Sequence, residues 1–359
     1  MSEVQSGLEG VVAFATQIAE PDRDGGALRY RGVDIEELVG TVPFEHVWGL
    51  LVDDSFEPGL GRSAMQPLPV HSGNVRVDVQ AGLAILAADW GLGQLIDIDE
   101  RQARDDLARL SAATLSFVAQ SARDTAAPAV SAAEVEGAAS TAESFLLSWR
   151  GEADPKAARA IDAYWVSAAE HGMNASTFTA RVVASTGADC AAALSAAVGA
   201  LSGPLHGGAP SRVLKMLDEV EALGDATRWV TQALDRGERL MGFGHRVYRA
   251  EDPRARVLRR TARELDAPRL AVAEALEEAA LAELHARKPD RVLATNVEFW
   301  SAVVLDFAQI PAELFTPMFA CARTAGWSAH VLEQMREARL IRPSARYVGK
   351  PPRGRDTVG

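Results

Sequence analysis

Apolar residues recur at the three- and four-residue spacing of α-helices over most of the chain from about residue 155 to residue 336. Glycine or proline interrupts this pattern, as at Gly172 and between Gly203 and Gly208. Helices of this kind bury their apolar faces against one another, so the pattern predicts an all-α protein. The predicted helices span 77–91, 99–122, 155–171, 174–186, 189–201, 211–222, 225–239, 253–265, 271–285, 296–308 and 316–336.

The first part of the chain has a mixed pattern. The segment 11–16 carries Val and Phe side chains and is predicted to be a strand. The sequence GGALRYRGVDIEEL predicts a glycine turn, a short extended piece and a helix that begins near Asp34. The Ala- and Ser-rich stretch 126–141 is predicted to be a loop, and the tail after Arg346 to be extended.

Several residues mark predicted helix starts. Pro253 fits the first turn of the helix predicted at 253–265. Thr295 or Asn296 can cap the apolar helix predicted at 296–308. Thr316 followed by Pro317 predicts the cap and first turn of the last long helix.

Length and charge bound the possible functions. The chain has 359 residues, enough for two lobes that share one site, and 48% of them are apolar. The net charge of −12 argues against general nucleic-acid binding and requires a local cationic pocket for any anionic substrate. No apolar run reaches membrane-spanning length, and the first residues lack a signal-peptide pattern, so we expect no membrane contact.

The cysteines and histidines predict no metal site. Cys190 and Cys321 lie in apolar surroundings and are expected to be reduced core thiols of a cytoplasmic protein. The histidines have no thiolate or carboxylate companions at ligand spacing, so no metal is expected. His330 lies in a long apolar helix and is interpreted as a packed core histidine or one that supports a site residue.

Polar residues cluster where neither the helical pattern nor a glycine break requires them. The clusters are EHGMNAST with His171 and Asn174, GPLHGGA with His206, GFGHRVYRAEDPRA with His245, Arg249 and Arg254, and TNVEFW with Glu298.

Each cluster also has a structural interpretation. His171 can cap the next helix, and His206 can be an ordinary loop histidine, although its glycines suggest close backbone approach to a ligand. His245 and its arginines can form a solvated loop. Glu298 can be a first-turn acid that the helix dipole favours.

Together the clusters resemble the citrate synthase family. GPLHGGA, GFGHRVYR-x-x-DPRA, NV-acid-F and FTPMFACARTAGWSAH occur in the family's order, and YRGVDIEEL and HGMNASTFTARVVAST also fit. The resemblance covers most of the chain and implies an all-α fold with the site in a cleft that closes on oxaloacetate. It implies a large domain of residues 1–207 and 314–359 and a small domain of residues 208–313. It also implies a homodimer whose sites borrow an arginine from the partner.

The chemistry of this family needs a base, two proton donors and cations. An acetyl thioester is a poor carbon acid, so its methyl proton requires a positioned base and a donor for the enolate oxygen. Oxaloacetate is a dianion that suits fork-shaped arginines. The CoA thioester is a substrate, and no cofactor is expected. By resemblance, Glu298 is the base, His206 the enolate donor, and His245 the donor to the ketone. Arg254 and Arg323 bind the carboxylates, Arg342 acts across the dimer, His171 and Asn174 complete the pocket, and Arg249 meets CoA phosphate.

Two positions depart from the family pattern. The family usually has Asp where this chain has Glu298, and Pro210 follows GPLHGGA where Asn is common. The nearest alternative is a 2-methylcitrate synthase, because one methylene of propionyl-CoA changes binding by only about 1–3 kcal/mol. A second alternative is a non-catalytic sensor of oxaloacetate or CoA, which only the Glu298 substitution supports. Cleavage of citrate with ATP is disfavoured because the sequence shows no Gly-rich phosphate loop.

Overall fold

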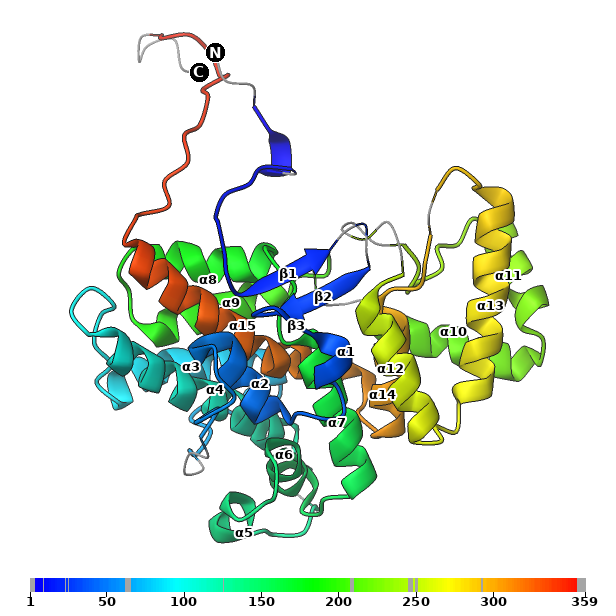
Figure 1. The fold of residues 1–359 in the computed structure, drawn as a ribbon, viewed down its shortest axis with the longest axis horizontal. Coiled ribbons are helices and arrows are strands. Elements are labelled where there is room, and N and C mark those ends of the chain that lie inside the picture. Colours follow the sequence, from blue (N-terminus) through cyan, green and yellow to red (C-terminus); the bar gives the residue numbers. More distant parts are fainter. Residues whose placement is uncertain are drawn as a thin grey trace.

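The computed structural model describes residues 4–8, 10–22, 24, 26–61, 66–124, 126–206, 210–244, 248, 251–291 and 293–353. The protein is built mainly from helices, with one small sheet near its start, so the predicted all-α fold is confirmed (Figure 1). The first helices are α1 (Ile35–Leu38), α2 (Phe44–Asp53), α3 (Val75–Asp89), α4 (Glu100–Ala122), α5 (Ala132–Glu136), α6 (Thr141–Arg150) and α7 (Pro155–Ala168). The later ones are α8 (Ala175–Ser185), α9 (Cys190–Leu201), α10 (Pro210–Leu223), α11 (Ala226–Asp235), α12 (Pro253–Glu264), α13 (Leu270–Arg287), α14 (Val297–Phe307) and α15 (Phe315–Glu337).

The eleven predicted helices are all present, and their ends differ from prediction by four residues or fewer. Side chains cap most of them, and the predicted alternative Asn296 is the one that caps α14. Asp252 caps α12 ahead of Pro253, Asn296 caps α14, and Asp34 caps α1. The predicted cap at Thr316 is wrong, because α15 begins at Phe315 directly after a 3₁₀ turn and has no side-chain cap. A proline fits anywhere in the first turn, so the Thr-Pro pair does not fix the start.

The sheet lies beyond the predicted strand. Strands β1 (Ala19–Asp22), β2 (Ala27–Tyr30) and β3 (Val33–Asp34) form an antiparallel sheet in that order. Residues 11–16 have no strand structure, so that prediction is wrong. The two longer strands flank a Gly-containing segment of the sequence, which favours a hairpin there. Val11 and Val12 are exposed, and no strand among the described residues pairs with them.

The predicted loop at 126–141 contains a short helix, α5. Its start is a capping box, in which Ser131 and Glu134 bond each other's backbone nitrogens. The Ser and Ala content of the stretch hid this signal, so the loop prediction is wrong over Ala132–Glu136.

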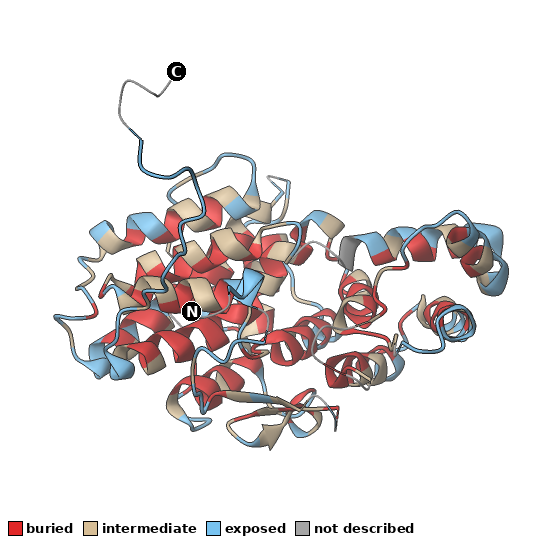
Figure 2. Cartoon of the chain, turned by 90° about the horizontal axis from the view of Figure 1, so that it is seen from above, coloured by how far each residue is buried: buried red, intermediate tan, exposed pale blue. Residues whose placement is uncertain are grey.

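The core lies around α15, which packs against α2, α4, α7, α8 and α9. Buried residues fill the centre of this group and exposed ones its periphery (Figure 2). Helices α10 to α14 gather on one side, where α12 and α14 contact α7 (Figure 1). The division into domains at 207/208 and 313/314 stays a prediction. Cys190 and Cys321 are both free and buried, as predicted.

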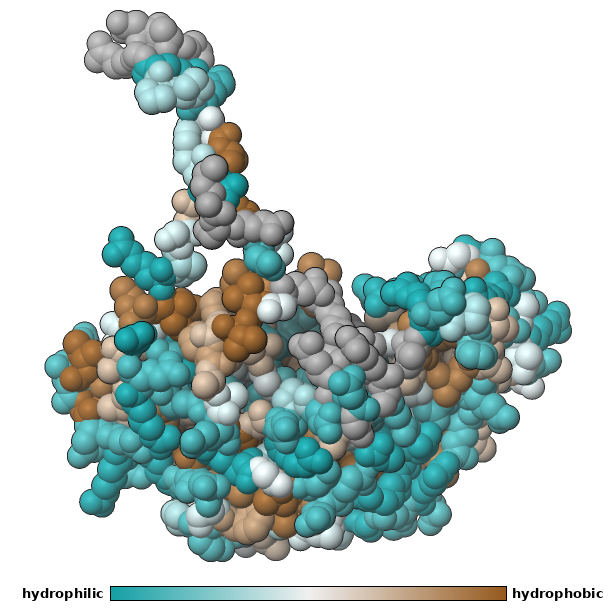
Figure 3. Space-filling model, turned by 45° about the horizontal axis from the view of Figure 1, so that its top comes forward, coloured by the Kyte–Doolittle hydropathy of each residue, from teal (hydrophilic) through white to brown (hydrophobic). Residues whose placement is uncertain are grey.

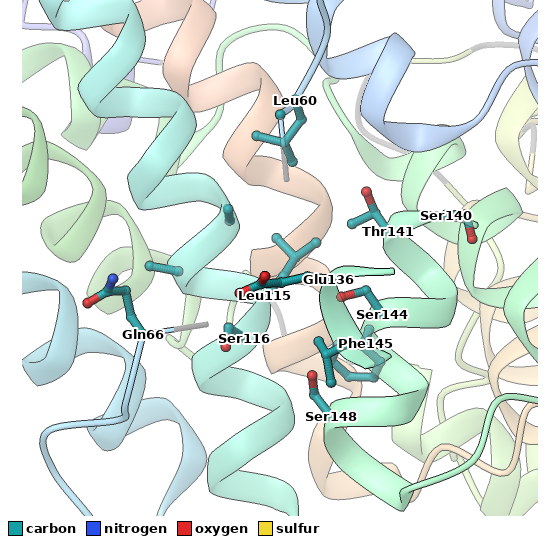
Figure 4. A pocket seen from close by; sticks show the side chains of 14 residues that line it. Leu60, Gln66, Leu115, Ser116, Glu136, Ser140, Thr141, Ser144, Phe145 and Ser148 are labelled. Carbon is teal, nitrogen blue, oxygen red and sulfur yellow. The ribbon is translucent and has the colours of Figure 1, made fainter. Parts of the chain in front are cut away.

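No helix among the described residues is long and apolar enough to cross a membrane. A small cavity of about 70 Å³ lies between α4, α5 and α6 and is lined by apolar side chains together with several hydroxyl groups (Figure 4). A water molecule occupies about 30 Å³ in the liquid, so this cavity has room for water rather than for CoA. It contains none of the predicted site residues.

Candidate active site

His206 lies in the turn after α9, and the first turn of α8 holds its ring. The imidazole Nε2 is 3.0 Å from the Ser176 hydroxyl and 3.4 Å from the Ser176 backbone nitrogen. A backbone N–H can only donate, so Nε2 accepts and the neutral ring carries its proton on Nδ1. Burial, followed by the charge of Arg323, lowers the pKa of His206 to about 4. At neutral pH His206 is therefore an uncharged ring with one N–H to donate.

Asn174 forms the N-cap of α8. Its Oδ1 accepts hydrogen bonds from the backbone nitrogens of Ser176 and Thr177, each over 3.1 Å. The Ser176 hydroxyl lies 2.9 Å from the same oxygen and accepts a hydrogen bond from Trp327 Nε1 over 3.2 Å. The helix cap is thus Asn174, and the capping role that the sequence left open for His171 is not observed.

His171 lies in the loop between α7 and α8 and meets Tyr248. Its Nε2 is 3.0 Å from the Tyr248 hydroxyl, and the two rings are 5.3 Å apart. Burial raises the pKa of Tyr248, so the hydroxyl stays protonated at neutral pH. Sequence analysis did not single out Tyr248. Its place between His245 and Arg249 was the available signal.

Arg254 lies in the first turn of α12 as a buried cation with a fixed partner. Its Nε and Nη2 donate to the Asp252 carboxylate over 3.0 and 2.9 Å. The same carboxylate accepts from the backbone nitrogen of Val297 over 3.0 Å, which ties α12 to the start of α14. Burial opposes the charge, but Asp252 outweighs it and raises the pKa of Arg254. Asp252 is a second contributor that the sequence analysis passed over.

Arg323 is the buried cation with the fewest fixed contacts in the site. It lies on α15 with 3% of its surface exposed, and its guanidinium carbon is 4.7 Å from the centre of the Phe319 ring. Its Nε and Nη1 have no hydrogen-bond partner among the described residues. Burial lowers its pKa. Buried guanidinium N–H groups without acceptors destabilise the folded protein unless an anion accepts their hydrogen bonds, so this edge suits a carboxylate ligand.

Glu298 lies in the first turn of α14, where Asn296 Oδ1 accepts from its backbone nitrogen over 3.0 Å. Burial raises the pKa of Glu298, while Arg254 and Arg239 act in the opposite direction. The dipole of α14 favours the ionised form as well. Glu298 is therefore a half-buried carboxylate whose pKa burial raises, which favours its taking up a proton.

Two distant motifs meet beside Glu298. Phe243 and Thr295 form an antiparallel bridge, and the Gly244 nitrogen donates to the Ala294 carbonyl over 2.7 Å. Gly242 has a φ of +86°, and a Cβ there would lie 2.7 Å from the Phe299 Cβ. Gly242, Phe243 and Gly244 can lie against TNVEFW because position 242 has no side chain.

Three predicted site residues remain, and the structure describes only one of them. His245 and Arg249 lie outside the described residues. Arg342 is exposed in the segment after α15. No group of three or more His, Cys, Asp or Glu side chains among the described residues could hold a metal ion.

Comparison with known proteins decides the family. The model of the citrate synthase C-terminal domain matches residues 7–344. The chain belongs to the citrate synthase family. It is therefore an acyltransferase. A Mycobacterium tuberculosis protein with the provisional name citrate synthase 2 is 65% identical over 98% of this chain and 95% of its own length.

Two solved structures have the same fold. The crystal structure of citrate synthase from Thermotoga maritima has 30% identity and a TM-score of 0.77, with 98% of each chain covered. Citrate synthase from Thermoplasma acidophilum has 27% identity and a TM-score of 0.80, with 99% of this chain and 98% of that chain covered. The latter was solved as a ternary complex with carboxymethyl coenzyme A and oxaloacetate.

Proposed function

We propose that the protein condenses acetyl-CoA with oxaloacetate and hydrolyses the resulting thioester to citrate and CoA. One arrangement carries the proposal. The unpaired guanidinium edge of Arg323 lies near the neutral His206, whose pKa it lowers. The Arg323 guanidinium can bind a substrate carboxylate, and the His206 ring can donate a hydrogen bond to a carbonyl oxygen that gains negative charge.

Oxaloacetate binds first in this mechanism. Arg254 and Arg323 meet its carboxylates, and His171 and Asn174 border the pocket. Arg254 is already held by Asp252, so little rotational freedom is lost when the substrate arrives. His171 is held by Tyr248 in the same way.

Proton removal comes next. Glu298 takes a proton from the acetyl methyl group, and His206 donates a hydrogen bond from Nδ1 to the thioester oxygen as the enolate forms. A neutral donor suits this step, because a charged imidazolium would give up its proton rather than share it. Protonated Glu298 is stabilised by the burial that raises its pKa.

Condensation and hydrolysis complete the reaction. The enolate carbon attacks the ketone carbon of oxaloacetate, and His245 donates a proton to the new alkoxide. Water then attacks the thioester carbonyl, the C–S bond breaks, and CoA leaves as the thiol. One acetyl-CoA, one oxaloacetate and one water give one citrate and one CoA.

A thiol-release assay tests this function. The purified protein is mixed with oxaloacetate and either acetyl-CoA or propionyl-CoA, and free CoA is followed with a thiol reagent. We expect oxaloacetate-dependent release with a higher kcat/KM for acetyl-CoA. A preference for propionyl-CoA would make the protein a 2-methylcitrate synthase, and no release with either would leave it a binding protein.

We also propose a homodimer in which each site uses Arg342 of the partner subunit. Large apolar side chains remain exposed on the terminal segments and on the helical face below them (Figure 3). A second copy of the chain would bury such a surface. The exposed residues include Val11, Val12, Ile85, Ile96 and Leu340.

Mixed dimers test the shared arginine. Arg342→Ala and His245→Ala subunits are each expected to be inactive alone. In a mixed dimer one of the two symmetry-related sites regains both residues, so activity should return toward about half of the wild-type value per heterodimer. Activity is measured after refolding the two variants together. An inactive mixed dimer, with dimer formation shown by mass, would contradict the sharing.

Closure of two domains would make oxaloacetate bind before acetyl-CoA. We propose that residues 208–313 move as a unit when oxaloacetate binds, which completes the acetyl-CoA site. Oxaloacetate should raise the melting temperature and tighten acetyl-CoA binding, both measurable by scanning and titration calorimetry. Equal acetyl-CoA affinity with and without oxaloacetate would count against ordered closure.

A further inference from the structure

We propose that Asp252 is a positioning residue for the reaction: its carboxylate links Arg254, which binds oxaloacetate, to the start of the helix that carries the base Glu298. This inference rests on the proposed function, because it takes Arg254 to bind the substrate and Glu298 to remove the proton. Asp252 acts through these two residues and not on the substrate. One carboxylate then influences both substrate binding and proton removal.

Both oxygens of the Asp252 carboxylate accept hydrogen bonds. Oδ1 accepts from the backbone nitrogen and from Nε of Arg254, each over 3.0 Å. Oδ2 accepts from Arg254 Nη2 over 2.9 Å and from the Val297 backbone nitrogen over 3.0 Å. Asp252 is 0% exposed and Arg254 is 3% exposed, so water competes little for these bonds. The buried, two-bonded ion pair therefore sets the direction in which the guanidinium points.

Helix α12, which Asp252 caps, is also joined to α1 by ion pairs. Glu36 Oε1 is 2.5 Å from Arg256 Nε, and Glu36 Oε2 is 2.7 Å from Arg260 Nη1. These arginines lie one and two turns after Asp252 along the helix. The α12 side of the Asp252 bridge is thus anchored, and the bond to Val297 sets where α14 begins relative to it.

The other side of the bridge is the first turn of α14. Val297 is the first residue of this helix, and Glu298 follows it. Asn296 accepts a hydrogen bond from the Glu298 backbone nitrogen over 3.0 Å, and its own backbone nitrogen donates to the Gly242 carbonyl over 2.9 Å. First-turn N–H groups have no acceptor within their own helix, so external acceptors hold them. Asp252 is the acceptor for Val297 and therefore helps to place the backbone of Glu298.

A simpler interpretation is that Asp252 only caps α12. Asp followed by Pro also begins α7, where Asp154 accepts from the backbone nitrogens of Lys156 and Ala157. Asn caps a helix about as well as Asp, so a cap alone predicts that Asp252→Asn is harmless. The bridge predicts the opposite, because an amide has only one oxygen. Whichever way the amide turns, its NH₂ group faces two N–H donors, at Oδ1 or at Oδ2.

The experiment compares Asp252→Asn with the matched cap control Asp154→Asn by calorimetry and thiol release. In Asp252→Asn we expect oxaloacetate Kd to rise about 10- to 100-fold, the effect of losing a hydrogen bond to a charged group. The kcat at saturating substrates should fall about 10- to 100-fold, because a base misplaced by about 1 Å can lose roughly 100-fold. Asp154→Asn should match the wild type in both quantities.

An isotope effect shows whether the lost turnover comes from proton removal. Deuterium in the acetyl methyl group of acetyl-CoA slows only the step in which Glu298 takes the proton. If Asp252→Asn misplaces this base, proton removal limits the rate more strongly, and the isotope effect on kcat should exceed that of the wild type. An isotope effect equal to the wild-type value, together with a lower kcat, would contradict the positioning of Glu298.

Two double-mutant cycles separate the two sides of the bridge. In a Glu298→Gln background the base is absent, so Asp252→Asn should lower kcat little further but should still raise oxaloacetate Kd. In an Arg254→Gln background, Asp252→Asn should raise oxaloacetate Kd no further. General damage to the fold would instead give additive losses in both backgrounds.

Wild-type kcat and oxaloacetate Kd in Asp252→Asn would overturn the inference and leave Asp252 as a helix cap. If Asp252→Asn does not fold, Asp252→Ser takes its place, because Ser can still cap α12 but brings one oxygen where the carboxylate has two. Wild-type values in that variant would overturn the inference as well. A wild-type protein that neither binds oxaloacetate nor releases CoA would instead refute the proposed function.

Discussion

Replacing His206 with alanine should lower turnover by a factor of about 100 to 1,000, the usual cost of losing one donor to a developing oxyanion. The reason lies in its fixed tautomer. Ser176 occupies Nε2, so Nδ1 carries the proton and is the ring atom that can donate to the thioester oxygen. Oxaloacetate affinity should change little, because the arginines supply that binding. Steady-state kinetics and calorimetry on the same preparation separate the two quantities.

Ser176→Ala is the matched control for this prediction. It removes the hydroxyl but keeps the backbone N–H that dictates the tautomer, so turnover should fall about tenfold at most. The pH profile gives a second check. With a pKa of about 4, His206 stays neutral from about pH 5 to 8 and should contribute no limb to the rate there. Near-normal turnover of His206→Ala would exclude it as the enolate donor.

The helices could be predicted from the sequence because their signals are local. Apolar spacing located each long helix, and Asn296 is a cap that was placed without coordinates. The sheet could not be placed in the same way. Its strands are short and marked by the turn between them, whereas the valine-rich segment 11–16 has strand composition but no partner among the described residues.

The site residues that sequence analysis missed are those that fix the position of another site residue. Tyr248 orients His171, and Asp252 joins Arg254 to α14. Their roles depend on contacts between segments far apart in the chain, which no local pattern records. His330 was interpreted as a packed core or supporting histidine. It is 1% exposed, which confirms its burial. Its contact with Glu170 adds a charge partner that spacing alone could not show.

Glu298 is the position where the chain departs from its family, and its burial has consequences that can be measured. A folded-state pKa above the unfolded value means that the ionised carboxylate costs stability, and the cost appears as pH rises through the unfolded pKa toward the folded one. Glu298→Gln removes that charge, so at neutral pH the variant should melt at the wild-type temperature or above. The acid limb of kcat/KM in the wild type should likewise lie above about 4.3, the ordinary pKa of glutamate.

Turnover should respond to Glu298 in a graded way. Glu298→Gln cannot take a proton and should lose about 100- to 10,000-fold in turnover, the usual contribution of a general base. Glu298→Asp keeps the acid but shortens it by about 1 Å, and a misplacement of that size can cost roughly 100-fold. We expect Asp to be slower than Glu because the rest of the site has adjusted to the longer side chain. Oxaloacetate affinity should be unchanged in both. If Glu298→Gln keeps most of the wild-type turnover, Glu298 is not the base. If Glu298→Asp is faster than the wild type, Glu298 is still the base, but the site has not adjusted to the longer side chain.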